Sequence, residues 1–345
     1  MKHKDIVFLS GIMLLFIVGA TIHATQGVML SYYIAEYSLQ GAVQGYPAGI
    51  QEIGLILSIF LASYLFRKFK KTKILLFMAS LMTLTLVGLG SRPSFWLLCV
   101  YYMCFGLSFG TFDSLASSLI SDLYPTKSGI MMSYMRAFYS AGGMLAPQVL
   151  NYLLIRGLLW NQSILVVAGF CILILFFFIF VSYPKIPKPV EHSGIKDDLS
   201  FKALISFIKM PKAWIILLIG FFFASHQIGF TVWIVRYLSE YRNMGKLGFS
   251  VLSAYWIGVL ISRLLLPRLI TSPKTILIWG NLLSGIVLSV GLSTSNKALT
   301  FVLMGLVGLF EGLVVPMIME CACAIDRSNS ALACSTLIFI NNIGG

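Results

Sequence analysis

Long apolar runs recur along almost the whole chain, and short polar segments separate them. A helix needs about 20 apolar residues to cross roughly 30 Å of hydrocarbon. Because the bilayer interior offers no water, a crossing chain must satisfy its backbone hydrogen bonds within helices or a closed barrel. The sequence therefore predicts an all-α polytopic membrane protein. Ten full runs lie near 6–32, 44–66, 74–90, 95–120, 129–155, 161–183, 213–238, 249–267, 274–294 and 298–323, and an eleventh begins near Ser330.

Composition excludes several other classes of protein. Hydrophobic residues make up 58% of the chain and charged residues only 11%, whereas a soluble domain has roughly 25% charged residues. The net charge of +13 is concentrated in short segments between the apolar runs, a pattern typical of membrane topology and not of nucleic-acid binding. The six cysteines and four histidines show no metal-ligand spacing. No nucleotide-binding loop is visible. We therefore expect no metal, no cofactor, no nucleic-acid partner and no enzymatic activity.

The distribution of lysine and arginine predicts the orientation of the chain. Basic residues gather on the cytoplasmic side of membrane proteins, and this rule places the N-terminus in the cytoplasm. We expect the protein to lie in the plasma (inner) membrane. The predicted cytoplasmic segments hold Lys2, Lys4, the cluster at 67–73, Lys127, the six lysines from Lys185 to Lys212, Arg268, Lys274 and Arg327, whereas the outer segments hold Arg92, Arg156, Arg242, Lys246 and Lys297.

The two halves of the sequence resemble each other. Six spans in residues 1–183 precede a polar cytoplasmic segment at 184–212, and the remaining spans fill residues 213–345. Transporters are commonly built from repeated halves with the solute site near their interface. The chain would end within its eleventh span, so we expect a twelfth to be missing. The matches are Glu36-Tyr37 with Glu240-Tyr241, Asp113 with Glu311, and Gly142-Gly143 with Gly344-Gly345, at offsets of 204, 198 and 202 residues.

This layout resembles the major facilitator superfamily over the whole chain. The family's loop between spans two and three is similar to Ser63 to Lys73, which keeps the basic cluster with Arg67 and Lys68 but lacks the usual Gly and Asp. Gly258 to Arg263 is similar to the family's Gly-Arg element in span eight. The resemblance implies two six-helix bundles and secondary transport by alternating access, with gating or structural roles for Arg67, Lys68 and Arg263.

Within that superfamily the chain looks most like the fucose-permease-type branch. Tyr255-Trp256-Ile257-Gly258 leading to Arg263 is similar to its span-eight pattern, and Asp113 falls where that branch carries a carboxylate in span four. The branch's carboxylate in span one has no match in His23 to Gly27. The resemblance implies proton-coupled import of a sugar or related metabolite, with the lipid bilayer, a small solute and protons as partners and a monomeric protein.

Charged residues inside the predicted spans are the first candidates for solute or proton binding, because each costs about 2.5–3.5 kcal/mol at the bilayer centre. Asp113 is expected near the midplane and Glu311 at the equivalent depth of span ten. Asp113 either binds a proton or forms a structural pair with Arg136 of span five. Arg136 would then bind an anion or serve as the charge partner. Glu52 in span two is a further candidate.

Uncharged and titratable polar residues supply weaker candidates. His226 and Gln227 lie in the middle of span seven, where a proton-relay role competes with a histidine satisfied by a neighbouring helix. Gln26 could line a cavity. Tyr33 and Trp233 could stack on a sugar ring.

Two other functions stay open. One is an efflux antiporter for drugs or metabolites, since Gly142 to Pro147 keeps part of an exporter motif in span five. The other is a membrane sensor that transports nothing.

Overall fold

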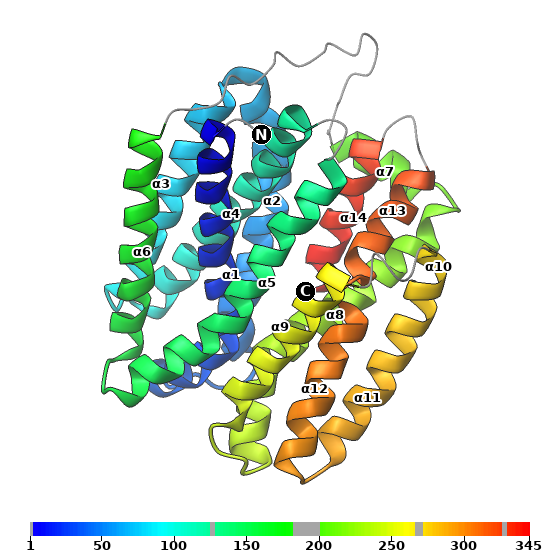
Figure 1. The fold of residues 1–345 in the computed structure, drawn as a ribbon. Helices are drawn as coiled ribbons and strands as arrows, with labels where there is room; N and C mark the ends of the chain where they lie inside the picture. Colours follow the sequence, from blue (N-terminus) through cyan, green and yellow to red (C-terminus); the bar gives the residue numbers. More distant parts are fainter. Residues whose placement is uncertain (1–2, 125–127, 182–200, 266–271, 326–329) are drawn as a thin grey trace. The chain divides into compact units, whose positions relative to one another are not determined.

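A computed structural model describes residues 3–124, 128–181, 201–265, 272–325 and 330–345, and within these ranges every regular element is helical (Figure 1). The first half contains α1 (His3–Tyr37), η1 (Gly41–Gly45), α2 (Tyr46–Lys68), α3 (Lys71–Gly90), α4 (Phe95–Leu123), α5 (Ser128–Ile155) and α6 (Trp160–Phe180). The second contains α7 (Phe201–Ile208), α8 (Ala213–Arg236), η2 (Tyr237–Tyr241), α9 (Leu247–Leu265), α10 (Pro273–Thr275), η4 (Ile276–Gly280), α11 (Asn281–Ser293), α12 (Lys297–Glu311), α13 (Val314–Ile325) and α14 (Ser330–Gly344).

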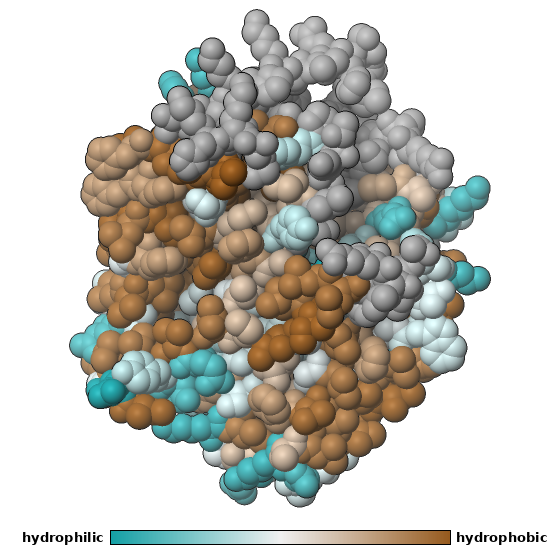
Figure 2. Space-filling view, viewed as in Figure 1, coloured by the Kyte–Doolittle hydropathy of each residue, from teal (hydrophilic) through white to brown (hydrophobic). Residues whose placement is uncertain are grey.

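Nine helical segments within the described residues are long and apolar enough to cross a membrane. They match nine of the ten full runs predicted from the sequence. The remaining run, 129–155, corresponds to α5, which is not among these nine segments. Figure 2 shows hydrophobic side chains along the sides of the helices on one face and hydrophilic side chains gathered at the lower helix ends. The prediction of an all-α polytopic membrane protein is confirmed.

Contacts divide the chain into two compact units. One consists of Met1–His23, Met29–Gly142 and Val149–His192, and the other of Ala24–Val28, Gly143–Gln148 and Ser193–Gly345. The domain boundaries at 183 and 212 remain a prediction. Part of the predicted central loop is helical, because α7 lies within it.

In the first unit, α2 and α4 approach each other at glycines. A Cβ atom on Gly54 would overlap the carbonyl oxygen of Met103, and one on Gly106 would overlap that of Gln51. Gly110 lies against the side chain of Ser58. Small residues permit such backbone contact between membrane helices, where van der Waals packing replaces the hydrophobic effect as the source of association.

The second unit repeats this contact between α9 and α12. Gly258 lies against the carbonyl of Gly305, Gly308 against that of Tyr255, and Gly312 against Ser262. Each of these contacts has a counterpart between α2 and α4. The residue numbers differ by 204 between α2 and α9, and by 202 between α4 and α12. A third matching pair joins Gly142 to Ile17 and Gly344 to Phe221. These repeated contacts support the internal duplication predicted from the sequence.

The helix that carries Glu311 is broken, unlike its counterpart α4. α12 ends at Glu311 and α13 begins at Val314. Pro316 lacks the N–H that would donate to the carbonyl of Gly312, so the proline explains the break. Arg263 Nε donates to that same carbonyl at 3.2 Å and satisfies it.

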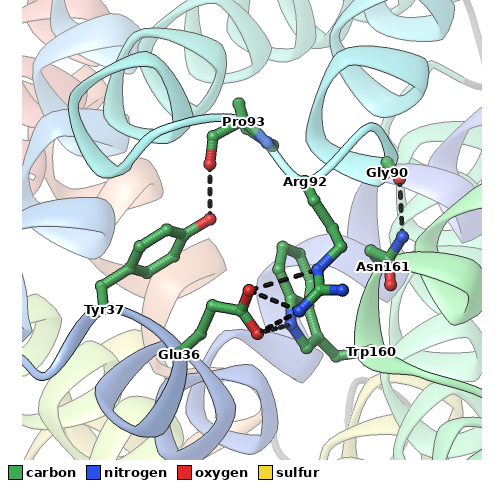
Figure 3. Close-up of polar contacts among 7 residues, drawn as sticks. All are labelled: Glu36, Tyr37, Gly90, Arg92, Pro93, Trp160 and Asn161. Carbon is green, nitrogen blue, oxygen red and sulfur yellow. Dashed lines mark hydrogen bonds and ion pairs between the residues drawn. The ribbon is translucent and has the colours of Figure 1, made fainter.

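A polar cluster joins the end of α1 to the α3–α4 turn and the start of α6 (Figure 3). Arg92 Nη2 donates to both oxygens of Glu36, at 2.5 and 2.8 Å, and Trp160 Nε1 donates to Glu36 Oε2 at 3.5 Å. Tyr37 Oη donates to the carbonyl of Pro93 at 2.7 Å. Arg92 adopts a φ of 55°, a left-handed conformation that costs roughly 1–3 kcal/mol outside glycine. The bidentate ion pair opposes that cost.

The second unit makes the equivalent connection, but its arginine lies after α8, whereas Arg92 of the first unit lies in the α3–α4 turn. Arg242 follows η2 and donates to the carbonyls of Ser293 and Thr294, at 3.0 and 2.9 Å. Glu240, the counterpart of Glu36, pairs with Arg236 of α8 at 2.6 Å. The connection between the first helix and the turn after the third is thus kept, although its ion pair is not.

Gly308→Ala tests the glycine contact. We expect it to lower the melting temperature by several degrees, because overpacking costs about 1–3 kcal/mol and the new Cβ would overlap the carbonyl of Tyr255. Thermal unfolding of the detergent-solubilised protein, followed by size-exclusion chromatography, measures the change.

Gly305→Ala, one turn away on α12, is the matched control. Its Cβ would lie 3.5 Å from the carbonyl oxygen of Ala254, an ordinary contact, and alanine gains about 1 kcal/mol of helix propensity. Equal losses in the two variants would contradict the proposed contact.

Candidate functional site

The first unit holds an ion pair between α4 and α5. Arg136 Nη2 donates to Asp113 Oδ2 at 3.0 Å. The side chains are 37% and 23% exposed, respectively. Asp113 Oδ1 is buried and has no hydrogen-bond partner. The structure thus brings together two residues that the sequence singled out, in the pairing that was one of the two alternatives for Asp113.

Aromatic rings lie one helical turn from this ion pair. Phe109 of α4 contacts the rings of His23 and Tyr139, with centroids 5.9 and 6.0 Å apart. His23 and Tyr139 are themselves 6.3 Å apart. His23 Nε2 is buried without a hydrogen-bond partner, and such burial disfavours a charged imidazole.

The second unit holds a buried carboxylate at the end of α12. Glu311, with a side chain 1% exposed, lies 2.6 Å from His226 Nε2 of α8. It accepts hydrogen bonds from Tyr255 Oη of α9 at 2.8 Å and from Ser284 Oγ of α11 at 2.5 Å. Gln227 Nε2 donates to Tyr255 Oη at 2.8 Å. We call these five residues the Glu311 cluster.

Sequence reasoning found three members of this cluster and missed two. Glu311, His226 and Gln227 were candidates, whereas Tyr255 entered only as part of a motif and Ser284 was not considered. A serine or tyrosine in an apolar run is common in membrane helices. The only available signal was the spacing of Asn281 and Ser284, two polar residues that helical periodicity places on one face.

The expected equivalence of Asp113 and Glu311 is wrong by one helical turn. The glycine contacts relate α4 to α12 at an offset of 202 residues, which pairs Asp113 with Val315 and Phe109 with Glu311. Four residues of helix correspond to about 6 Å. The sequence comparison matched Asp113 with Glu311 at an offset of 198 residues, but the two carboxylates occupy different positions in the two repeats.

A cavity of about 540 Å³ lies beside the Glu311 cluster in the second unit, between α8 and the η4–α11 helix. Its polar lining residues are His226, Asn281 and Ser284, and apolar side chains such as Ile219, Phe222 and Leu288 make up most of the rest.

Three further candidates are described by their burial. Glu52 of α2 is buried, and its Oε2 has no hydrogen-bond partner. Gln26 is buried on α1. Trp233 of α8 is 41% exposed. Tyr33 cannot stack on a solute, because it is buried between Trp160 and Tyr102, whose hydroxyl lies 2.8 Å from its own.

The basic motif residues make local contacts. Lys68 Nζ donates to Tyr64 Oη at 2.7 Å on the same helix. Arg263 stabilises the break after α12, as described above. The side chain of Arg67 lies outside the described residues, so its predicted gating role is untested.

Comparison with known proteins identifies the family to which this chain belongs. The family model described as "Major Facilitator Superfamily" matches residues 10–345. The chain belongs to the major facilitator superfamily. This is a family of membrane transporters and not of enzymes, in agreement with the sequence prediction.

Curated relatives are distant and only partly matched. The chain is 26% identical over 211 residues to a TsgA homolog of Buchnera aphidicola, an alignment that covers 60% of this chain and 52% of that protein. It is 26% identical over 231 residues to the MFS-type transporter YfkL of Bacillus subtilis, covering 65% and 58%. The matched region spans about half the length of these relatives.

Solved structures of the superfamily share the fold. The nucleoside transporter NupG aligns with a TM-score of 0.76 at 12% identity, covering 97% of this chain and 88% of that one. FucP in its outward conformation aligns with a TM-score of 0.69 at 14% identity, covering 99% and 90%. Because transporters with different solutes align similarly well, these likenesses show the fold alone.

A double-mutant cycle tests the link between His226 and Glu311. We expect His226→Ala to destabilise the protein much less in a Glu311→Gln background than in the unsubstituted chain, with a coupling of about 1–3 kcal/mol. Unfolding in a denaturing detergent measures the four free energies.

Ser225→Ala is the control, because Ser225 is the chain neighbour of His226 and its hydroxyl donates to the backbone of Phe221. Its coupling to Glu311→Gln should be near zero. A His226 coupling as small as that of Ser225 would show that the pair contributes nothing to stability.

Proposed function

We propose that this chain acts as a secondary transporter, which carries a small polar solute across the inner membrane by alternating access in symport with protons. Membership of the major facilitator superfamily supports the transport class. One observation carries the proposal: in each half of the duplicated sequence, titratable side chains stand at positions where the other half has apolar side chains.

The repeat offsets make this observation specific. Asp113 and Arg136 correspond to Val315 and Ile338, and Glu311 and His226 correspond to Phe109 and Ile22. Each half packs the same helices with apolar side chains at the positions that are charged in the other. Charges in a membrane interior are expensive and mark solute or proton pathways. Because the scaffold does not require these charges, we assign them to function.

The two carboxylates have different roles in this proposal. Asp113 is partly exposed, is held by one hydrogen bond and has an oxygen without a partner, so it can take up a proton without losing a hydrogen bond at that oxygen. Glu311 is buried and contacts three other helices. We assign proton coupling to Asp113 and the positioning of α8, α9 and α11 to Glu311.

The resemblance to the fucose-permease-type branch supports an importer that works as a monomer. Its residues do not identify a sugar: Tyr255 belongs to the Glu311 cluster and Arg263 stabilises the helix break. We therefore infer the solute class from the Asp113–Arg136 ion pair.

Flux measurements test the proposal. With the chain reconstituted in liposomes, we expect an inward proton gradient to drive accumulation of at least one of L-fucose, uridine, dialanine and L-lactate. Asp113→Asn should lower that accumulation at least about tenfold, because an asparagine side chain cannot bind and release the coupling proton.

Glu240→Gln is the control, since Glu240 pairs with Arg236 within one helix end and is 44% exposed. It should transport like the unsubstituted chain. If no gradient moves any solute, the transporter proposal fails. If Asp113→Asn still accumulates solute, Asp113 is not the coupling residue.

Cysteine labelling tests the proposed orientation. A membrane-impermeant maleimide should label Lys297→Cys in intact cells and Lys68→Cys only after lysis, because both positions are exposed and lie at helix ends predicted to face opposite sides. The unsubstituted chain gives the background from native cysteines. The reverse labelling pattern would place the N-terminus outside.

A further inference from the structure

The charge balance of the Asp113–Arg136 pair restricts what the site can bind. The pair carries one negative and one positive group, and the corresponding positions in the second half, Val315 and Ile338, carry none. Both arrangements are neutral overall. An uncompensated charge in a low-dielectric interior is strongly unfavourable. A transport cycle built on this pair should therefore keep its total charge near zero in every occupied state.

We propose, resting on the function proposed above, that the solute is a small monoanion, of the monocarboxylate class, which replaces Asp113 on Arg136 when Asp113 binds a proton. The proton enters on Oδ1, the buried oxygen that has no hydrogen-bond partner. The neutral acid no longer holds the guanidinium by charge, and the solute's carboxylate takes that place. One proton and one monoanion enter together, so the site is neutral before and after.

The geometry of the pair favours this exchange. Only one hydrogen bond, of 3.0 Å, joins the two residues, and both side chains are accessible. The planar guanidinium group matches carboxylates in two-pronged hydrogen bonding. A neutral sugar can hydrogen-bond to both side chains but would not replace the negative charge that Arg136 loses when Asp113 binds a proton, and a cation would be repelled by Arg136.

The neighbouring titratable groups are compatible with this balance. His23 from α1 is one turn away, beside Phe109, in surroundings that disfavour its charged form. Glu52 is the one acidic residue of α2, and it is buried. Lys71 of α3 donates to Ser118 of α4 at 2.5 Å. The rings of Phe109 and Tyr139, 6.0 Å apart and one helical turn from the ion pair, are the apolar surface that we assign to the rest of the solute.

Uptake into liposomes tests the solute class. The probes are radiolabelled L-lactate and gluconate as monoanions, L-fucose as a neutral sugar and L-alanine as a zwitterion. We expect a proton gradient to drive uptake of at least one monoanion, and a valinomycin-imposed membrane potential to leave its initial rate unchanged. Arg136→Gln should lower that rate at least about tenfold, because glutamine offers the solute's carboxylate no positive charge.

Asp113→Asn gives the diagnostic readout. Because asparagine is neutral, Arg136 stays available: we expect exchange of labelled for unlabelled monoanion to persist, proton-driven accumulation to disappear and the flux to become sensitive to membrane potential. Arg156→Gln, directly after α5 and stacked on Tyr152, is the matched control and should behave like the unsubstituted chain. Arg136→Lys and size-exclusion profiles separate loss of function from misfolding.

The outcomes distinguish the two proposals. Proton-driven uptake of fucose or alanine without either monoanion would overturn the monoanion class and leave a proton-coupled transporter. Monoanion uptake that a membrane potential drives would overturn the charge balance. If none of the four probes moves under any gradient, the transporter proposal fails and the solute class falls with it.

Discussion

Backbone contact at glycines is the constraint on which the rest of this structure depends. Lipid tails solvate apolar side chains as well as other helices do, so membrane helices associate through close packing. Gly54 and Gly106 allow this between α2 and α4, and Gly258 and Gly308 allow it between α9 and α12. These contacts fix how far α4 and α12 slide along their partners, and they thereby set the positions of Asp113 and Glu311.

The same contacts separate what the fold needs from what function needs. Because the two halves share packing at constant offsets, each position has a counterpart whose side chain shows what packing alone accepts. At Asp113 the counterpart is Val315, and at Glu311 it is Phe109. A charge whose counterpart in the repeat is apolar is not required by the glycine contacts that the two halves share, and this supports an asymmetric use of the scaffold.

The sequence was sufficient for the fold class and insufficient for the register of the site. Apolar runs and the repeat across 184–212 need only composition and order, so they are readable without a structure. The match between Asp113 and Glu311 compared residue types alone, and residue type does not give the register that the glycine contacts set at an offset of 202 residues. The partners Tyr255 and Ser284 come from other helices, and only tertiary packing brings their hydroxyls to Glu311.

The two acidic residues, Asp113 and Glu311, differ in how many hydrogen bonds protonation would weaken. Protonating Glu311 would weaken its contacts to His226, Tyr255 and Ser284 together, on three different helices, within a side chain that water hardly reaches. Asp113 has one hydrogen bond and an unpartnered oxygen. A residue that exchanges protons during a cycle must have two states of similar free energy. This contrast is the reason why the proposed cycle gives the changing charge to Asp113 and a fixed position to Glu311.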